Sequence, residues 1–143
     1  MFQIVERPIS VDEILESVKD DSAGATLIFL GTVRDHNEGI KVDGIHYEAY
    51  VEMAEKSIAK IEKDTLSMWK IIKFAAVHRI GNLKVGEISV AIGVSSEHRD
   101  EAFKAGRYAI DRVKMEVPIW KKEKSISGSE SWVEGTPLDG GNL

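Results

Sequence analysis

A stripe of apolar side chains between residues 51 and 68 is the feature that most constrains the fold of this chain. Its members recur at alternating steps of three and four residues, which is the spacing of one face of an α-helix. The stripe consists of Val51, Ala54, Ile58, Ile61, Thr65 and Met68. The sequence therefore predicts a long amphipathic helix over residues 51–68.

Two further helices are predicted from capping patterns and periodicity. The first begins at Ser10 with a Ser-x-x-Glu capping box and ends near Asp20. The other follows a cap at Ser95 or Ser96 and runs to about Val113, with acidic residues in its first turn, where the helix dipole favours negative charge. Its expected buried face consists of Ala102, Phe103, Gly106, Ile110 and Val113.

Segments rich in β-branched and aromatic residues predict strands between these helices. The expected strands are 2–5, 25–33, 45–50, 71–78, 87–95, 118–124 and 131–134. The polar segment 35–44 is expected to be a mobile loop, and 79–86 a turn that joins two strands as a hairpin. A Ser/Gly-rich turn at 125–129 joins the last two strands, and the tail from Gly135 is expected to be loose.

The order of these elements favours an α+β fold. Hairpins alternate with helices that follow strands, which is not the pattern of a doubly wound parallel sheet. We expect one domain over residues 1–143, with a mainly antiparallel sheet, about three helices and a flexible tail at about 135–143. No glycine-rich phosphate loop follows a predicted strand, so the common nucleotide-binding folds have no support.

The composition excludes several classes of function. A formal net charge of -5 argues against general binding of nucleic acid, which depends on clustered lysine and arginine. The chain has no cysteine, and its four histidines lack a metal-ligand spacing, so no metal site is expected. No segment has the ~20 apolar residues of a membrane span, and no signal peptide is evident, so we expect a cytoplasmic protein without membrane contact.

The sequence contains three charged clusters, and each of the first two has features of an anion site. After the second predicted strand, the guanidinium of Arg34 could hold a phosphate through paired donors. The alternative is an exposed ion pair of Arg34 with Asp35 or Glu38. At the start of the third helix, free backbone N–H groups favour an anion, and His98 and Arg99 would add positive charge. Simple capping of the helix is the alternative there.

The third cluster is the segment Lys114–Glu123, which contains Lys114, Lys121 and Lys122. If the third helix runs that far, Lys114 lies on its apolar face, four residues after Ile110. Burial beside other cations would lower the pKa of this lysine and make it a usable acid, base or nucleophile. On the following strand Lys121 shares a face with Ile119, whereas Lys122 faces the other way. The alternatives are a helix-terminal lysine that reaches solvent and edge-strand lysines that discourage aggregation.

Five motifs are spread over nearly the full length of the chain. They are Gly31–Gly39 (GTVRDHNEG), Tyr47–Ala54 (YEAYVEMA), His78–Gly81 (HRIG), Ser95–Arg99 (SSEHR) and Val117–Glu123 (VPIWKKE). In this order they resemble the large catalytic subunits of molybdopterin synthase, the MoaE family. The resemblance implies an α/β hammerhead-type fold and a heterotetramer, in which a homodimer of large subunits carries a small ubiquitin-like subunit at each end.

The resemblance also implies a reaction. The C-terminal glycine thiocarboxylate of the small subunit enters a pocket of the large one and donates sulfur to cyclic pyranopterin monophosphate (precursor Z). Two transfers convert this substrate to the dithiolene of molybdopterin, in the biosynthesis of the molybdenum cofactor, and the large subunit uses no cofactor of its own. The absence of cysteine fits a chain whose sulfur comes from a partner.

Site residues follow from the same resemblance. Lys114 matches the essential lysine beside the incoming thiocarboxylate, and Lys121 matches the second lysine of the catalytic pocket. Arg34, His98 and Arg99 match the pocket for the substrate phosphate, which could be assembled across the large-subunit dimer. The resemblance adds to this pocket Thr32, Val33, Lys122 and Glu123, some of them only through backbone groups.

Two rival functions are open at this point. One is a noncatalytic α+β sensor module that binds a phosphorylated metabolite in the same cationic pocket. The other is a structural subunit whose only role is dimerisation. Either rival predicts that the lysines take part in no sulfur transfer.

Overall fold

The computed structural model describes residues 2–126, 128 and 130–133, which form three α-helices and nine β-strands. The helices are α1 (Val11–Val18), α2 (Val51–Met68) and α3 (Arg99–Glu116). The strands are β1 (Phe2–Val5), β2 (Ala25–Thr32), β3 (His36–Asn37), β4 (Ile40–Ala49), β5 (Ile71–Arg79), β6 (Gly81–Lys84), β7 (Ile88–Ser96), β8 (Ile119–Ser125) and β9 (Glu130–Val133).

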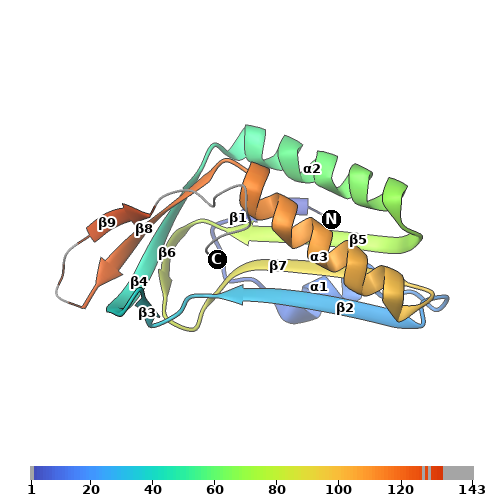
Figure 1. Cartoon of the computed structure of the whole chain (residues 1–143), viewed down its shortest axis with the longest axis horizontal. Coiled ribbons are helices and arrows are strands. Elements are labelled where there is room, and N and C mark those ends of the chain that lie inside the picture. Colours follow the sequence, from blue (N-terminus) through green and yellow to red (C-terminus); the bar gives the residue numbers. More distant parts are fainter. Residues whose placement is uncertain (1, 127, 129, 134–143) are drawn as a thin grey trace.

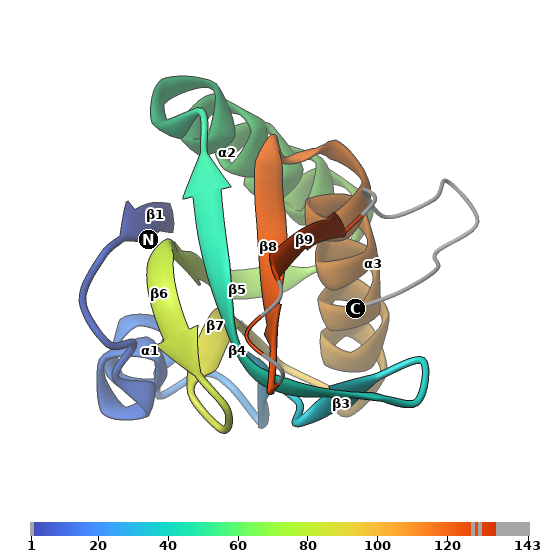
Figure 2. The same ribbon diagram turned by 90° about the vertical axis from the view of Figure 1, so that its left-hand side faces the viewer.

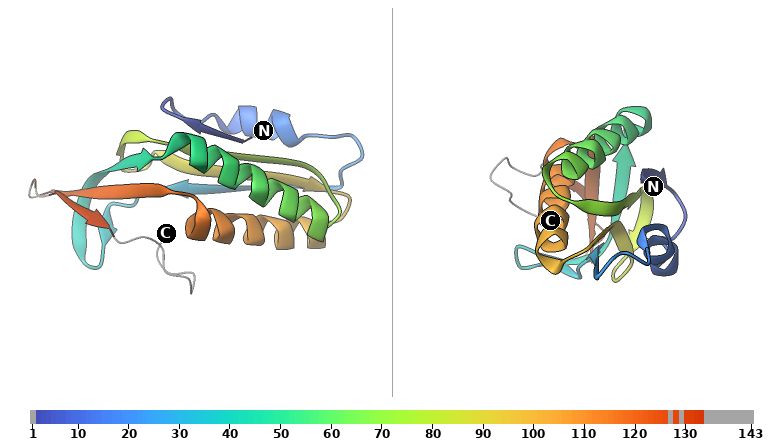
Figure 3. Two further views of the ribbon diagram at one scale, coloured as in Figure 1. Left: turned by 90° about the horizontal axis from the view of Figure 1, so that it is seen from above. Right: turned by 90° about the vertical axis from the view of Figure 1, so that its right-hand side faces the viewer.

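A four-stranded sheet in the order β1-β5-β7-β2 forms the centre of the fold (Figure 1). β1 runs parallel to β5, and the other neighbours are antiparallel. α2 and α3 cover one face of this sheet, and α1 covers the other (Figure 3). Successive side chains of β5 point to opposite faces of this sheet and so contribute to the core on both sides. Phe74 and Ala76 pack under α2 and α3, whereas Ala75 and Val77 pack against α1.

A second sheet, in the order β3-β4-β8-β9 with β6 also paired to β4, lies at one end of the first (Figure 2). A small apolar cluster fills the junction, and it contains Val33, Val42, Ile45, Tyr47 and Leu83. β8 follows almost directly from α3, so the last turn of that helix lies beside the second sheet. This junction positions the candidate site.

The predicted α+β class, with mostly antiparallel strands and three helices, is confirmed. α2 has the predicted bounds and buries the middle of the predicted stripe, which consists of Ala54, Ile58, Ile61 and Thr65. The predicted cap of α1 at Ser10 also forms, since the hydroxyl of Ser10 accepts a hydrogen bond from the backbone N–H of Glu13 at 3.3 Å. None of the helices in the described part of the chain is long and apolar enough to cross a membrane.

The start of α3 differs from the prediction. Ser95 and Ser96 are the last residues of β7, and His98 is the residue that precedes the helix. The hydroxyl of Ser96 donates to the carbonyl of His98 at 2.5 Å, so this serine stabilises the turn before the helix and does not cap it. The prediction for Phe103 is also wrong, because its side chain is 61% exposed, whereas the small Ala105 lies against the sheet.

Two segments predicted as loop or turn contain strands. Within residues 35–44, β3 and the start of β4 pair as a short hairpin. Within residues 79–86, β6 pairs with β4, a strand far away in the sequence. Local composition does not predict such pairing, because the partner supplies the hydrogen bonds. The predicted tail at 135–143 lies outside the described residues.

Candidate active site

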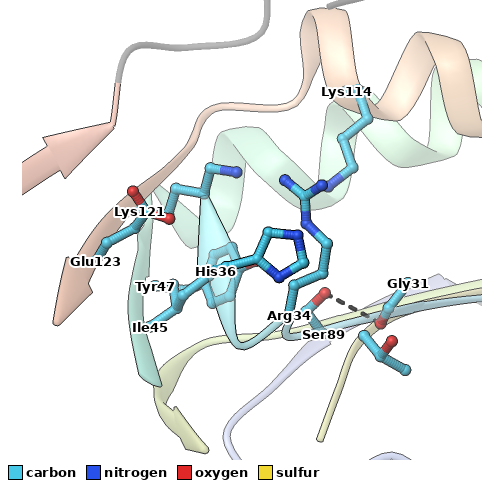
Figure 4. A pocket seen from close by; sticks show the side chains of 10 residues that line it. Gly31, Arg34, His36, Ile45, Tyr47, Ser89, Lys114, Lys121 and Glu123 are labelled. Carbon is cyan, nitrogen blue, oxygen red and sulfur yellow. Dashed lines mark hydrogen bonds between the residues drawn. The ribbon is translucent and has the colours of Figure 1, made fainter. Parts of the chain in front are cut away.

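A cavity of about 230 Å³ lies where β2, β4, β8 and the last turn of α3 meet (Figure 4). Its lining comes from segments that are far apart in the sequence, so only the folded chain forms it. The lining residues are Gly31, Thr32, Arg34, His36, Ile45, Tyr47, Ser89, Lys114, Lys121 and Glu123.

Three basic side chains line this cavity from three different segments. Arg34 follows β2, Lys114 belongs to the last turn of α3, and Lys121 lies in β8. Burial, and then the positive charge of Lys121, lower the pKa of Lys114 from 10.5 to about 8. Burial also lowers the pKa of Lys121. The negative charge of Glu123 raises this pKa, and the positive charge of Arg34 lowers it. A group of cations that lines one cavity favours an anionic ligand.

β4 and β8 form one wall of the cavity. Their register places Tyr47 opposite Lys121 and Ile45 opposite Glu123, so these side chains share the cavity face of the sheet. Glu123 accepts a hydrogen bond from the side-chain amide of Asn37 at 2.9 Å. The short strand β3 therefore holds the carboxylate of Glu123 in place.

Behind this wall lies a buried histidine, His78, which is 3% exposed. Its Nδ1 donates to the carbonyl of Arg79 at 2.8 Å, and its ring meets that of Tyr47 edge to face, with centroids 5.1 Å apart. Burial, and then the positive charge of Lys114, lower the pKa of His78 from 6.5 to about 3. This histidine is therefore neutral and supports Tyr47, and it adds no cation to the site.

Not all of the predicted site residues line the cavity. Val33 is 3% exposed within the apolar cluster at the junction, and its backbone N–H donates to the carbonyl of Glu87 at 3.0 Å. Lys122 points to the opposite face of β8, where its ammonium lies 3.1 Å from the carboxylate of Glu130 and 5.1 Å from the ring centroid of Trp132. Those that do line it are Thr32, Arg34, Lys114, Lys121 and Glu123.

His98 and Arg99 are not brought to the cavity of their own chain. They lie at the N-terminal end of α3, whereas Lys114 lies in its last turn. The fifteen-residue separation between Arg99 and Lys114 corresponds to about 22 Å at about 1.5 Å per residue. His98 is exposed, and its Nε2 lies 3.7 Å from the carboxylate of Glu97. One chain alone therefore does not form the predicted phosphate pocket.

Tyr47, Ser89 and His36 line the cavity without having been predicted as site residues. A signal existed for Tyr47, since it lies two residues after Ile45 in a predicted strand and therefore shares its face. His36 was within a segment predicted as a loop, and its Nδ1 lies 2.7 Å from the carboxylate of Asp35. Ser89 had no such signal, because an irregularity of the β2–β7 pairing sets its position.

The fold and the cavity define a class of protein, a small α+β domain with a cavity lined by cations where its two sheets meet. The family model described as MoaE protein matches residues 4–116. A molybdopterin synthase catalytic subunit from Staphylococcus carnosus is 43% identical over 132 residues, which is 92% of this chain and 87% of that protein. The chain belongs to the MoaE family.

Solved structures agree with this assignment. The crystal structure of molybdopterin synthase from Staphylococcus aureus superposes with a TM-score of 0.88 at 41% identity, and the match covers 93% of this chain and 96% of that one. A complex of subunits 1 and 2 of molybdopterin-converting factor from Helicobacter pylori gives a TM-score of 0.78 at 19% identity, covering 97% and 95%. At that identity the likeness shows the fold alone.

Proposed function

We propose that this chain is the catalytic subunit of a molybdopterin synthase, a cytoplasmic sulfurtransferase of molybdenum cofactor biosynthesis. Its substrate is cyclic pyranopterin monophosphate, and its sulfur donor is the C-terminal glycine thiocarboxylate of a small ubiquitin-like subunit. Two transfers produce the dithiolene of molybdopterin. The chain has no cysteine, so a thiocarboxylated partner is a fitting source of the sulfur.

The convergence of Arg34, Lys114 and Lys121 on one cavity is the observation that carries this proposal. Both ligands are anions: the guanidinium binds the substrate phosphate through paired donors, and the two lysines flank the thiocarboxylate. These cations are in place before the reaction, so they stabilise negative charge as sulfur adds and the cyclic phosphate opens. A pKa of about 8 lets Lys114 exchange a proton near neutral pH.

The other predicted residues divide into two groups in this proposal. Thr32 and Glu123 contact the substrate, because they line the cavity. Val33 and Lys122 contribute through the backbone that holds their neighbours Arg34 and Lys121 in position, since the side chains of Val33 and Lys122 point elsewhere. The site is thus smaller within one chain than the sequence predicts.

We further propose that two copies of the chain meet so that His98 and Arg99 of one copy reach the cavity of the other. The length of α3 supports this arrangement, because these residues cannot reach the cavity of their own chain. The N-terminus of α3 adds backbone N–H groups that favour a phosphate. A small subunit on each copy completes a heterotetramer.

The test is reconstitution with purified components. The chain is mixed with cyclic pyranopterin monophosphate and a small subunit that ends in a thiocarboxylate, and we expect dithiolene product. A small subunit that ends in an ordinary carboxylate is the matched control, and it should give none. If the pterin binds but no dithiolene forms with the thiocarboxylated subunit, the chain is a sensor and the proposed function is wrong.

A further inference from the structure

The phenol of Tyr47 is a buried hydrogen-bonding group of the cavity that the proposed function does not use. Its side chain is 6% exposed, lines the cavity and lies opposite Lys121 across the β4–β8 pair. Burial, the largest influence, raises the pKa of Tyr47 above 10.0, so the phenol keeps its proton at physiological pH. It is a neutral polar group in a cavity otherwise dominated by charge.

A β-bulge places Ser89 beside this phenol. In the β2–β7 pairing Gly31 is opposite Val90 and Thr32 is opposite Ile88, so Ser89 is an extra residue without a partner across the ladder. Bulges of this kind redirect a side chain, and they are common next to functional sites. Here the result is that the hydroxyl of Ser89 lines the cavity and is 3% exposed.

The hydroxyl of Ser89 is bound to the backbone, whereas the phenol of Tyr47 lines the cavity. The hydroxyl of Ser89 donates to the carbonyl of Gly31 at 3.2 Å (Figure 4), and a carbonyl can only accept. The single proton of Ser89 is therefore used in that bond. The phenol of Tyr47 keeps its own proton and lines the cavity, so it can exchange a hydrogen bond with a bound ligand.

From this geometry we propose that Tyr47 is a substrate-binding residue whose phenol hydrogen-bonds to a polar group of the bound pterin. The inference rests on the proposed function, and it adds a neutral hydrogen-bonding group to the cationic site. Arg34, Lys114 and Lys121 hold the anionic groups, whereas Tyr47 contacts a neutral part of the ligand. The bulge at Ser89 and the edge-to-face contact with His78 fix the phenol for this role.

The test compares Tyr47→Phe and Ser89→Ala with the wild-type chain in the reconstituted reaction. Tyr47→Phe removes the hydroxyl while keeping the ring, so we expect KM for the pterin to rise about three- to tenfold, which is the effect of one lost hydrogen bond. The turnover number should stay within about twofold, because a contact made equally before and during reaction affects binding alone. Ser89→Ala keeps the phenol, and its KM should rise less.

Tyr50→Phe is the matched control, because Tyr50 is 57% exposed and lies outside the cavity. Circular dichroism and thermal unfolding show whether each variant is folded. An unchanged KM for folded Tyr47→Phe overturns the inference, and so does a larger effect of Ser89→Ala than of Tyr47→Phe. If the wild-type chain and Tyr50→Phe both form product, the proposed function stands, whatever the result for Tyr47→Phe. If the wild-type chain makes no product, the proposed function fails and this inference fails with it.

Discussion

Replacing Lys114 with alanine is expected to slow sulfur transfer by roughly 10²- to 10⁴-fold, the range found for positioned proton-transfer and charge-stabilising groups. The reason is its position, since Lys114 is a partly buried cation of the cavity lining with a lowered pKa. The measurement is the single-turnover rate of product formation, with the complex of both subunits preassembled. Assembly and folding should be unaffected, because the alanine fits at the C-terminal end of α3.

Lys104→Ala is the control for this variant. Lys104 lies in the same helix, but its side chain is 58% exposed and pairs with Asp100 at 3.0 Å. Its loss should leave the rate unchanged, because exposed pairs of this kind contribute little. A Lys114→Ala complex that assembles normally and transfers sulfur at the wild-type rate would contradict the assignment and favour a purely structural role for the chain.

The pH dependence of the wild-type reaction is an independent test of the role of Lys114. Its pKa is lowered to about 8, so in the free enzyme the ammonium form predominates below pH 8 and is lost above it. Because the ammonium form binds the anionic ligands, we expect kcat/KM to fall as pH rises through about 8. Lys114→Ala should lack this inflection. An inflection at the same pH in Lys114→Ala would assign it to another group.

The second large effect is expected from mixing two inactive variants, Lys114→Ala and Arg99→Ala. If each site takes Lys114 from one copy and Arg99 from the other, a mixed dimer contains one site with both residues intact. Random exchange of subunits then restores roughly a quarter of the wild-type activity from two nearly inactive preparations. The measurement is product formation after the two dimers have been dissociated and reassembled together.

The mixed-dimer experiment separates two arrangements of the site. If Arg99 and Lys114 acted within a single chain, every site of a mixed dimer would lack one of them, and activity would stay near zero. Each variant reassembled alone is the control for recovery of the protein. Restored activity would also place the N-terminal end of α3 at the dimer interface, which agrees with the length of that helix.

Local sequence patterns correctly predicted the elements whose structure does not depend on pairing with distant parts of the chain. The stripe of α2 lies on one helix face and packs on the sheet, so periodicity alone gave its bounds. The start of α3 was mispredicted because Ser95 and Ser96 fit a helix cap and a strand end equally well. Pairing of β7 with both β2 and β5 decides between them, and that information is not local.

The candidate site likewise contains residues that local patterns predicted and residues whose position depends on distant parts of the chain. Lys114 was placed by helix periodicity and Lys121 by strand alternation, and both rules act over a few residues. The role of Tyr47 depends on a bulge at Ser89, and no local pattern marks that bulge. The separation of Arg99 from the cavity depends on where α3 begins and ends, which the sequence predicted only approximately.

A crystal structure of this chain bound to its small ubiquitin-like subunit would test most directly whether the cavity is a sulfur-transfer site. We predict that the extended C-terminus of the small subunit enters beside α3, with its terminal glycine within about 3.5 Å of the ammonium of Lys114 or Lys121. A terminus bound on another surface, with both lysines contacting water alone, would contradict the proposed function.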